Sequence, residues 1–424
     1  MHAMGTCYDV RTYRQSLSLS PLAMVKFGST IPEVKMIRRD ELWSIVLFLN
    51  EFVRSSIFYV WMPMQVSQEP GFGLTFVSVC TTAQFAADAF LKFFYGAIAS
   101  RGHSAVLVRV GVLLALVSTL VMWHTHGRFV LLALSILYGF GSATVWPAAI
   151  THFADASREN LAASMGKAFA PWMAGAGVGL MVANLFVQNM HVVQVMTVSA
   201  FVIVVISSWF LRFPTASSAM PLRQELEIVR VLGWRLRGLL LPMVLQTAII
   251  GTIVPFLSVF SGNVLHLVSI QYVIYLVAIG AITFVLLIPL GKLADQFGRL
   301  PLLTIAFLLA SGCTFIIGVT HNWHTALPPS VGFALSYAAI FPAWNALFVS
   351  SVPTRLRTRA IGLFTAVEDS GTVFGPLIGS LAWHYIGPRG PLWSASASMM
   401  LLALYFAAWW FRSLSARPTK VWTV

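Results

Sequence analysis

Residues 42–65, LWSIVLFLNEFVRSSIFYVWMPMQ, form an apolar run with a carboxylate and a guanidinium at its centre. The run is long enough to cross the hydrocarbon core of a bilayer as one helix. Charges at that depth are costly and are not expected to face lipid. Glu51 and Arg54 are three residues apart, so they share one face of a helix and can pair. We therefore predict that the other helices enclose this pair in a cavity.

The composition indicates a polytopic membrane protein. Hydrophobic residues make up 58% of the 424 residues and charged residues 10%, whereas a soluble protein carries roughly a quarter charged residues. Lys and Arg at the cytosolic ends of helices explain the formal charge of +13, and we expect no nucleic acid partner. Because Cys7, Cys80 and Cys313 offer neither a disulfide framework nor metal-ligand spacing, we also expect no metal and no cofactor.

Twelve apolar runs follow one another along the chain, each near or above the ~20 residues that a span needs. They cover residues 42–65, 72–98, 105–123, 129–153, 164–187, 192–212, 238–262, 269–291, 300–319, 327–351, 360–386 and 392–413. We predict an all-α membrane protein with twelve transmembrane helices in two pseudo-symmetric six-helix halves, 42–212 and 238–413. Residues 213–237 mix Arg and Glu with apolar residues, as in an amphipathic linker on the cytosolic membrane surface. Residues 1–41 are expected to be a disordered cytosolic tail and 414–424 a cytosolic C-terminus.

The basic residues set the predicted orientation. When both termini are placed in the cytosol, the outer loops carry only Arg128 and Arg389 of the 27 Lys and Arg residues. Cytosolic loops of membrane proteins are enriched in Lys and Arg. We therefore predict a multi-pass protein of the cell membrane with both termini cytosolic.

An internal repeat supports the two halves. Gly96 and Gly291 begin related loop sequences and lie 195 residues apart. The next pairs lie 196 residues apart: Gly102 with Gly298, Gly166 with Gly362, Gly175 with Gly371, and Gly179 with Gly375. Two parallel repeats of this kind are known in one class of transporter folds.

The repeat also predicts an asymmetric cavity. With the offset of 195, the charged residues of the first half have neutral counterparts: Glu51 corresponds to Gln246, Arg54 to Ile249, Asp88 to Thr283 and Lys92 to Leu287. The cavity should be polar on the first side and mostly apolar on the second. A substrate with a polar head and apolar tails would suit such a cavity.

The segment Gly291-Lys-Leu-Ala-Asp295-Gln-Phe-Gly298-Arg299 resembles the loop signature of the major facilitator superfamily. Its glycines permit a tight cytosolic turn. Asp295 would cap the next helix or pair with a cation of a neighbouring helix, so we predict a gating loop. The first-half copy carries Ser100 in place of the acid, which predicts a weaker latch there.

Glu51 and Arg54 have two interpretations, a structural ion pair that locks one helix to its neighbour, or a substrate or proton site. Low dielectric favours the protonated form of a carboxylate and a nearby arginine favours the ionised form. Glu51 is thus a candidate for proton coupling if the pair separates during a cycle. Asp88 and Lys92, four residues apart, form a second candidate pair. Lys92 is nearer the cytosolic end and is expected to snorkel, so Asp88 alone is taken as a site residue.

Further cavity residues are less clearly marked. Asn50, Gln246 and Glu368 are possible members, although Glu368 could instead lie at a wide cytosolic mouth. Trp146 and Trp172 could stack on sugar rings, but from the sequence alone interhelical packing or an interfacial belt is the favoured explanation. Two histidine pairs in outer loops, His124 with His126 and His321 with His324, are better explained as solvated residues than as metal ligands.

Several segments together resemble one family. Leu47-Phe-Leu-Asn-Glu-Phe-Val-Arg54, Phe85-Ala-Ala-Asp88-Ala, Pro342-Ala-Trp-Asn345 and Gly375-Pro-Leu-Ile-Gly379 are similar to the lipoteichoic-acid anchor glycolipid flippases of the major facilitator superfamily. The resemblance implies alternating access and proton-coupled movement of a diglucosyl-diacylglycerol between leaflets. It implies that the positions matching the family's headgroup and proton site are Glu51, Arg54, Asp88, Trp146 and Trp172. Ser100-Arg101 and Glu368 depart from the family pattern.

The expected partners are therefore a lipid or amphipathic small molecule, protons and the bilayer, with a proton gradient as the energy source. We expect a monomer. The alternative function is a proton-coupled exporter of amphipathic small molecules or drugs. An intramembrane enzyme is disfavoured because the predicted spans hold neither a Ser/His/Asp set nor a two-histidine metal motif.

Overall fold

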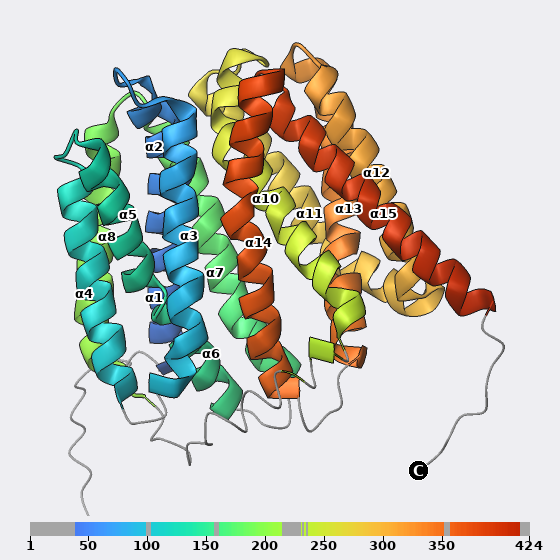
Figure 1. Ribbon diagram of the computed structural model, residues 1–424, viewed down its shortest axis with the longest axis horizontal. Helices are drawn as coiled ribbons and strands as arrows, with labels where there is room; N and C mark the ends of the chain where they lie inside the picture. Colours follow the sequence, from blue (N-terminus) through green and yellow to red (C-terminus); the bar gives the residue numbers. More distant parts are fainter. Residues whose placement is uncertain are drawn as a thin grey trace, which may run out of the picture. The chain divides into compact units, whose positions relative to one another are not determined.

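The computed structural model describes residues 39–98, 103–156, 161–213, 230, 233–234, 236–351 and 357–415. These residues are almost entirely helical, with no strand among them (Figure 1). Eleven helical stretches of the described chain are long and apolar enough to cross a membrane. Helix α14, with 30 residues, occupies the remaining predicted position. The described chain thus has helices at all twelve predicted positions.

The first half begins with α1 (Arg39–Ser55), which continues without interruption into η1 (Ser56–Trp61) and α2 (Met62–Met64). The short helix η2 (Val66–Gln68) follows. The remaining elements of this half are α3 (Gly73–Ile98), α4 (Ser104–Met122), α5 (Arg128–Ser142), α6 (Val145–Ala156), α7 (Leu161–Leu185) and α8 (Met190–Phe210).

The second half contains six helices, each long enough to span a bilayer. They are α10 (Arg237–Asn263), α11 (Ser269–Phe297), α12 (Arg299–Val319), α13 (Trp323–Ser351), α14 (Arg357–Ile386) and α15 (Gly390–Ser415). Of the predicted tail 1–41, residues 39–41 belong to α1, and of the predicted C-terminal segment 414–424, residues 414 and 415 belong to α15. Residues 1–38, most of the predicted linker, residues 416–424, Ser100 and Arg101 lie outside the described residues.

Each half has its own hydrophobic core. Trp43, Tyr138 and Phe201 are fully buried in a cluster whose members all come from the first half. Trp344 and Phe406 belong to the corresponding cluster of the second half. Contacts between the halves run through α3 with α14, α7 with α11, and η1 and α2 with α10. Figure 1 shows α3 and α14, far apart in sequence, side by side.

The first span changes its helical pitch directly after the charged residues, which the sequence analysis did not predict. The segment η1 is a π-helix. Pro63 lacks an N–H group and its ring would clash with the carbonyl four residues earlier in a regular α-helix. The hydroxyl of Ser56 also bonds back to the carbonyl oxygen of Phe52 at 2.7 Å. The wider turn of a π-helix accommodates both the proline ring and the hydroxyl bond. Such turns are frequent at functional sites.

The predicted span 129–153 consists of two helices, α5 and α6, separated at Ala143 and Thr144. Pro147 explains the break, because it cannot donate a hydrogen bond to the carbonyl of Ala143 and crowds it. The helix is therefore interrupted just before Trp146.

Close contacts between glycines and backbone carbonyls occur at equivalent positions in the two halves. A methyl group on Gly175 or Gly179 of α7 would overlap the carbonyl oxygens of Phe48 and Phe52 on α1. On α14, Gly371 and Gly375 approach Val244 and Ala248 of α10 in the same manner. Every one of these pairs is related by an offset of 196 residues. The contact of α10 with α14 therefore copies that of α1 with α7.

These contacts correct the predicted counterparts of the first-span charges. With the offset of 196, Glu51 corresponds to Thr247 and not Gln246, and Arg54 corresponds to Ile250 and not Ile249. The offset between the halves is 196 residues here and 195 residues at Gly96. The first half must therefore contain one residue more than the second half between these two points. The wider turns of η1, whose counterpart in α10 is α-helical, accommodate it. The counterparts remain uncharged, so the asymmetry of the two halves is unchanged.

The predicted gating loop is also corrected. Residues Gly291–Phe297 do not form a loop but complete α11, because one glycine costs a helix only about 1 kcal/mol. The turn is made at Gly298, whose φ of 91° and ψ of 147° suit glycine almost alone. Arg299 begins α12. Asp295 lies in the last turns of α11, and its side chain is not among those that the structure describes.

Candidate functional site

The centre of the site is the ion pair between Glu51 and Arg54 on α1. The Arg54 guanidinium donates a hydrogen bond to Oε2 of Glu51. Asn50 donates a hydrogen bond from Nδ2 to Glu51 Oε1 at 3.3 Å. All three residues are less than a tenth exposed, at 4%, 8% and 4% for Glu51, Arg54 and Asn50. The structure thus confirms that Glu51 and Arg54 lie on one face of the helix and form an ion pair.

Helix α3 closes one side of this pair. The guanidinium carbon of Arg54 lies 5.2 Å from the ring centroid of Phe85, a cation–π contact that stabilises a desolvated arginine. Three residues further along α3, Asp88 is 3% exposed. Arg54 and Glu51 both interact electrostatically with Asp88. The two acids of the first half and the arginine therefore belong to one charged cluster.

Lys92 does not snorkel, contrary to the sequence prediction. Its Nζ lies 2.5 Å from Asp88 Oδ2 and 3.0 Å from Oδ2 of Asp369 on α14. The Lys92 side chain is 13% exposed. A snorkelling lysine keeps its ammonium in water, whereas the ammonium of Lys92 is paired with two carboxylates. Lys92 thus joins the first half to the second, and we add it and Asp369 to the site.

Several buried polar atoms around the cluster have no hydrogen-bond partner among the described residues. They are Nε of Arg54, Oδ1 of Asn50, both amide atoms of Gln84 and the hydroxyl of Tyr138. Gln84 lies one helical turn before Asp88, and Tyr138 interacts electrostatically with Arg54 and Glu51. Buried polar groups are normally paired. These atoms include both donors and acceptors, which is what a ligand with several hydroxyl groups requires.

Sequence reasoning missed Gln84 and Tyr138. Gln84 precedes Asp88 by four residues, and this helical spacing was a usable signal. Tyr138, on α5, carried no such signal in the sequence.

The two tryptophans predicted for the site lie next to each other. Trp146 at the start of α6 and Trp172 on α7 have ring centroids 5.6 Å apart. Phe169 completes an aromatic trio, with its centroid 5.1 Å from that of Trp146 and 6.2 Å from that of Trp172. Both indoles are half-buried. The trio therefore offers partly open ring faces, as stacking on a sugar ring would require.

The second half contributes fewer polar groups. Gln246 on α10 is half-buried, and its Oε1 has no partner among the described residues. Glu368 on α14 accepts a hydrogen bond from Nε1 of the buried Trp344 at 3.2 Å. The repeat places Glu368 at the position of Trp172, so an acid in the second half stands where the first half has an aromatic ring.

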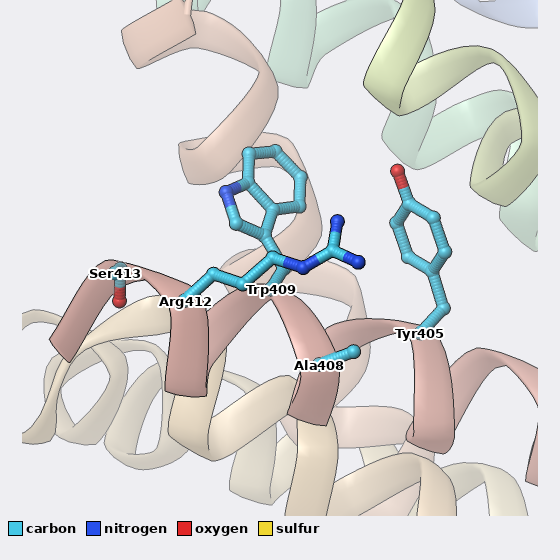
Figure 2. Close-up of a pocket in the computed structure, with 5 residues that line it drawn as sticks. All are labelled: Tyr405, Ala408, Trp409, Arg412 and Ser413. Atoms are coloured by element: carbon cyan, nitrogen blue, oxygen red, sulfur yellow. The ribbon is translucent and has the colours of Figure 1, made fainter. Parts of the chain in front are cut away.

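A separate cavity of about 550 Å³ lies near the C-terminal end of α15. Figure 2 shows Tyr405, Trp409 and Arg412 projecting around it. None of the predicted site residues lines this cavity. Across the described part of the chain, no group of three or more His, Cys, Asp or Glu residues could hold a metal ion.

Comparison with known proteins places this arrangement in a family. The family model of the Major Facilitator Superfamily matches residues 43–371. The chain belongs to this superfamily. It is therefore a multi-pass membrane transporter and not an enzyme, and the major facilitator fold predicted from the sequence is confirmed.

Individual relatives cover most of the chain. A protein of Staphylococcus saprophyticus named proton-coupled antiporter flippase LtaA is 26% identical over 383 residues, 87% of this chain and 93% of the relative. The protein of the same name from Staphylococcus aureus is 24% identical over 380 residues, 86% and 93% of the two chains. The resemblance predicted from the helix motifs is thus confirmed.

The fold also matches solved structures. A bacterial homologue of the human lysosomal transporter Spinster, in an inward-facing and unoccupied conformation, superposes with a TM-score of 0.69 at 16% identity, covering 90% of this chain and 98% of that one. At this identity the similarity concerns the fold alone.

Proposed function

We propose that this transporter flips a glycolipid of the lipoteichoic-acid anchor type across the cytoplasmic membrane, driven by proton exchange. The observation that carries the proposal is the buried cluster of Glu51, Arg54 and Asp88, all in the first half, beside the unpartnered polar atoms of Asn50, Gln84 and Tyr138. A transporter of small hydrophilic solutes has no need of such one-sided polarity. The relatives named proton-coupled antiporter flippase support the same assignment.

The headgroup would bind on the first-half side. Sugar hydroxyls would satisfy the unpartnered atoms of Asn50, Gln84 and Tyr138, which are costly to leave unpaired in a dry site. A sugar ring would stack on Trp146 or Trp172. The acyl chains would lie against the second half, where Ile250 and Leu287 stand in place of Arg54 and Lys92.

Protons would act on the acids of the same cluster. The ion pairs with Arg54 and Lys92 favour the ionised forms of Glu51 and Asp88. A headgroup whose hydroxyls donate hydrogen bonds to Glu51 would favour the ionised carboxylate and displace a proton from it, whereas protonation of Glu51 would weaken headgroup binding. Lipid and proton would thus compete at Glu51, as exchange requires. The protein would work as a monomer in the cell membrane, with both termini cytosolic.

The deciding experiment measures leaflet exchange in proteoliposomes. A fluorescent diglucosyl-diacylglycerol is incorporated, and dithionite reports the outer-leaflet fraction with and without an imposed pH gradient. We expect gradient-dependent exchange by the wild type and its loss in Arg54→Ala. Arg109→Ala is the matched control, because Arg109 lies over Trp209 away from the cluster and should leave exchange intact.

The same vesicles distinguish the alternative function. Absence of exchange for any glycolipid, together with proton-driven efflux of an amphipathic dye, would replace the flippase by an exporter. Glu51→Gln tests the role of this carboxylate in the proton step. If its transport responded to the gradient as the wild type does, Glu51 would be excluded as the coupling acid.

A further inference from the structure

The inference concerns Lys92, to which the proposed function assigns no part in the movement of the two halves. Its ammonium lies between two carboxylates on different halves of the molecule, 2.5 Å from Asp88 and 3.0 Å from Asp369. Asp88 and Asp369 also interact with each other electrostatically. One cation is thus shared by two anions across the contact of α3 with α14.

The charged residues around Lys92 include more acids than bases. Glu51, Asp88 and Asp369 carry three negative charges when ionised, and Arg54 and Lys92 carry two positive ones. These five residues therefore have an excess of one negative charge, and three of them, Glu51, Arg54 and Asp88, are less than a tenth exposed. Uptake of a single proton makes the cluster neutral, and this lowers the cost of burying it.

The position of that proton decides which partner Lys92 keeps. With Asp88 ionised, the ammonium is divided between the halves, and Asp88 and Asp369 repel each other across the contact. With Asp88 protonated, its attraction for Lys92 is largely lost and the ammonium pairs with Asp369 alone. The link between α3 and α14 is then stronger and the repulsion across it is gone.

We propose that Lys92 is a positioning residue that converts protonation of Asp88 into closure of α3 against α14. The proposal rests on the proton exchange of the proposed function but not on the identity of the lipid. Protonation favours the closed contact, and deprotonation favours its opening on the membrane side where α3 ends and α4 begins.

Other titratable groups lie around Lys92 and Asp88, but in the described residues they do not link α3 to α14 by an ion pair. Glu51 and Arg54 on α1 bind each other, and Glu368 on α14 is held by Trp344. Two further groups act on the cluster as neutral hydroxyls, Tyr59 on η1 and Tyr138 on α5. Of the cations and anions around the cluster, Lys92 and Asp369 form the ion pair that crosses between the halves.

The test measures the separation of the halves in the absence of substrate. Spin labels are placed by Val106→Cys at the start of α4 and Leu241→Cys at the start of α10, both exposed at 57%, with the native cysteines replaced. Double electron–electron resonance records the distance at mildly alkaline and mildly acidic pH. We expect the wild type to shift toward the short distance on acidification and Asp88→Asn to show that distance at both pH values.

Lys92→Met should lose the pH-dependent shift, whereas Lys92→Arg should keep it, which separates charge from folding. Lys167→Met is the control, since Lys167 pairs with Asp40 within the first half, and its shift should match the wild type. A wild-type shift in Lys92→Met, or no shift in the wild type, would overturn the proposal. Loss of the shift in Lys92→Met in a protein that moves no glycolipid would uphold the role of Lys92 and reject only the proposed lipid.

Discussion

The hydroxyl of Ser56 on η1 donates a hydrogen bond to the carbonyl oxygen of Gly179 on α7 at 3.2 Å. In the second half, Thr252 donates the equivalent bond to Gly375 at 3.1 Å. A side-chain bond between helices at this depth requires the two backbones to approach closely, which only a small residue allows. The same hydroxyl–glycine contact thus fixes the first helix of each half against its fifth.

This contact predicts that Gly179→Ala destabilises the protein. The added methyl group would overlap the carbonyl oxygen of Phe52, and overpacking of this kind costs about 1–3 kcal/mol. The melting temperature in detergent should fall. Gly177→Ala, on the same helix with open space at its Cβ position, is the matched control and should melt as the wild type or slightly higher. Equal melting of the two variants would contradict the close approach.

A second prediction concerns the buried ion pair. Removing one partner strands the other charge, which costs about 3–5 kcal/mol. We expect Glu51→Gln and Arg54→Met each to lower the melting temperature strongly. The double variant should regain much of that loss, because no unpaired charge is left, yet it should remain inactive in lipid exchange. Stability losses that simply add in the double variant would show that the two side chains do not interact.

The sequence could predict what depends on local pattern. Span lengths, the pairing of Glu51 with Arg54 and the repeat of glycines follow from hydropathy and spacing. The partnership of Lys92 with Asp369 could not be predicted, because no pattern in one sequence relates helices 277 residues apart. The π-helix was not predicted because it depends on two local effects that a hydropathy pattern does not record. These are the missing N–H group of Pro63 and the bond of the Ser56 hydroxyl to a backbone carbonyl. That same local insertion displaced the predicted counterpart of Glu51 by one residue.

The aromatic trio predicts a selective loss of substrate affinity. Trp172 is half-buried, so Trp172→Leu should change the melting temperature little. Removal of one stacking face is worth about 0.5–1.5 kcal/mol, which corresponds to as much as about a ten-fold weaker apparent affinity for the glycolipid. Exchange measured against lipid concentration gives this affinity. Trp209→Leu, at an indole that is 64% exposed on α8, should leave it unchanged, and an equal loss in both variants would remove Trp172 from the headgroup site.

The turn between α11 and α12 gives the last prediction. Gly298 has a φ of 91°, so Gly298→Ala forces an L-residue into a strained conformation at a cost of about 1–3 kcal/mol. Both the melting temperature and the transport rate should fall if the turn must keep this shape while the halves move. In α12, Gly312 has open space at its Cβ position, and Gly312→Ala should raise stability by up to about 1 kcal/mol. A Gly298→Ala protein that melts and transports like the wild type would show that the backbone at this turn relaxes to an ordinary conformation.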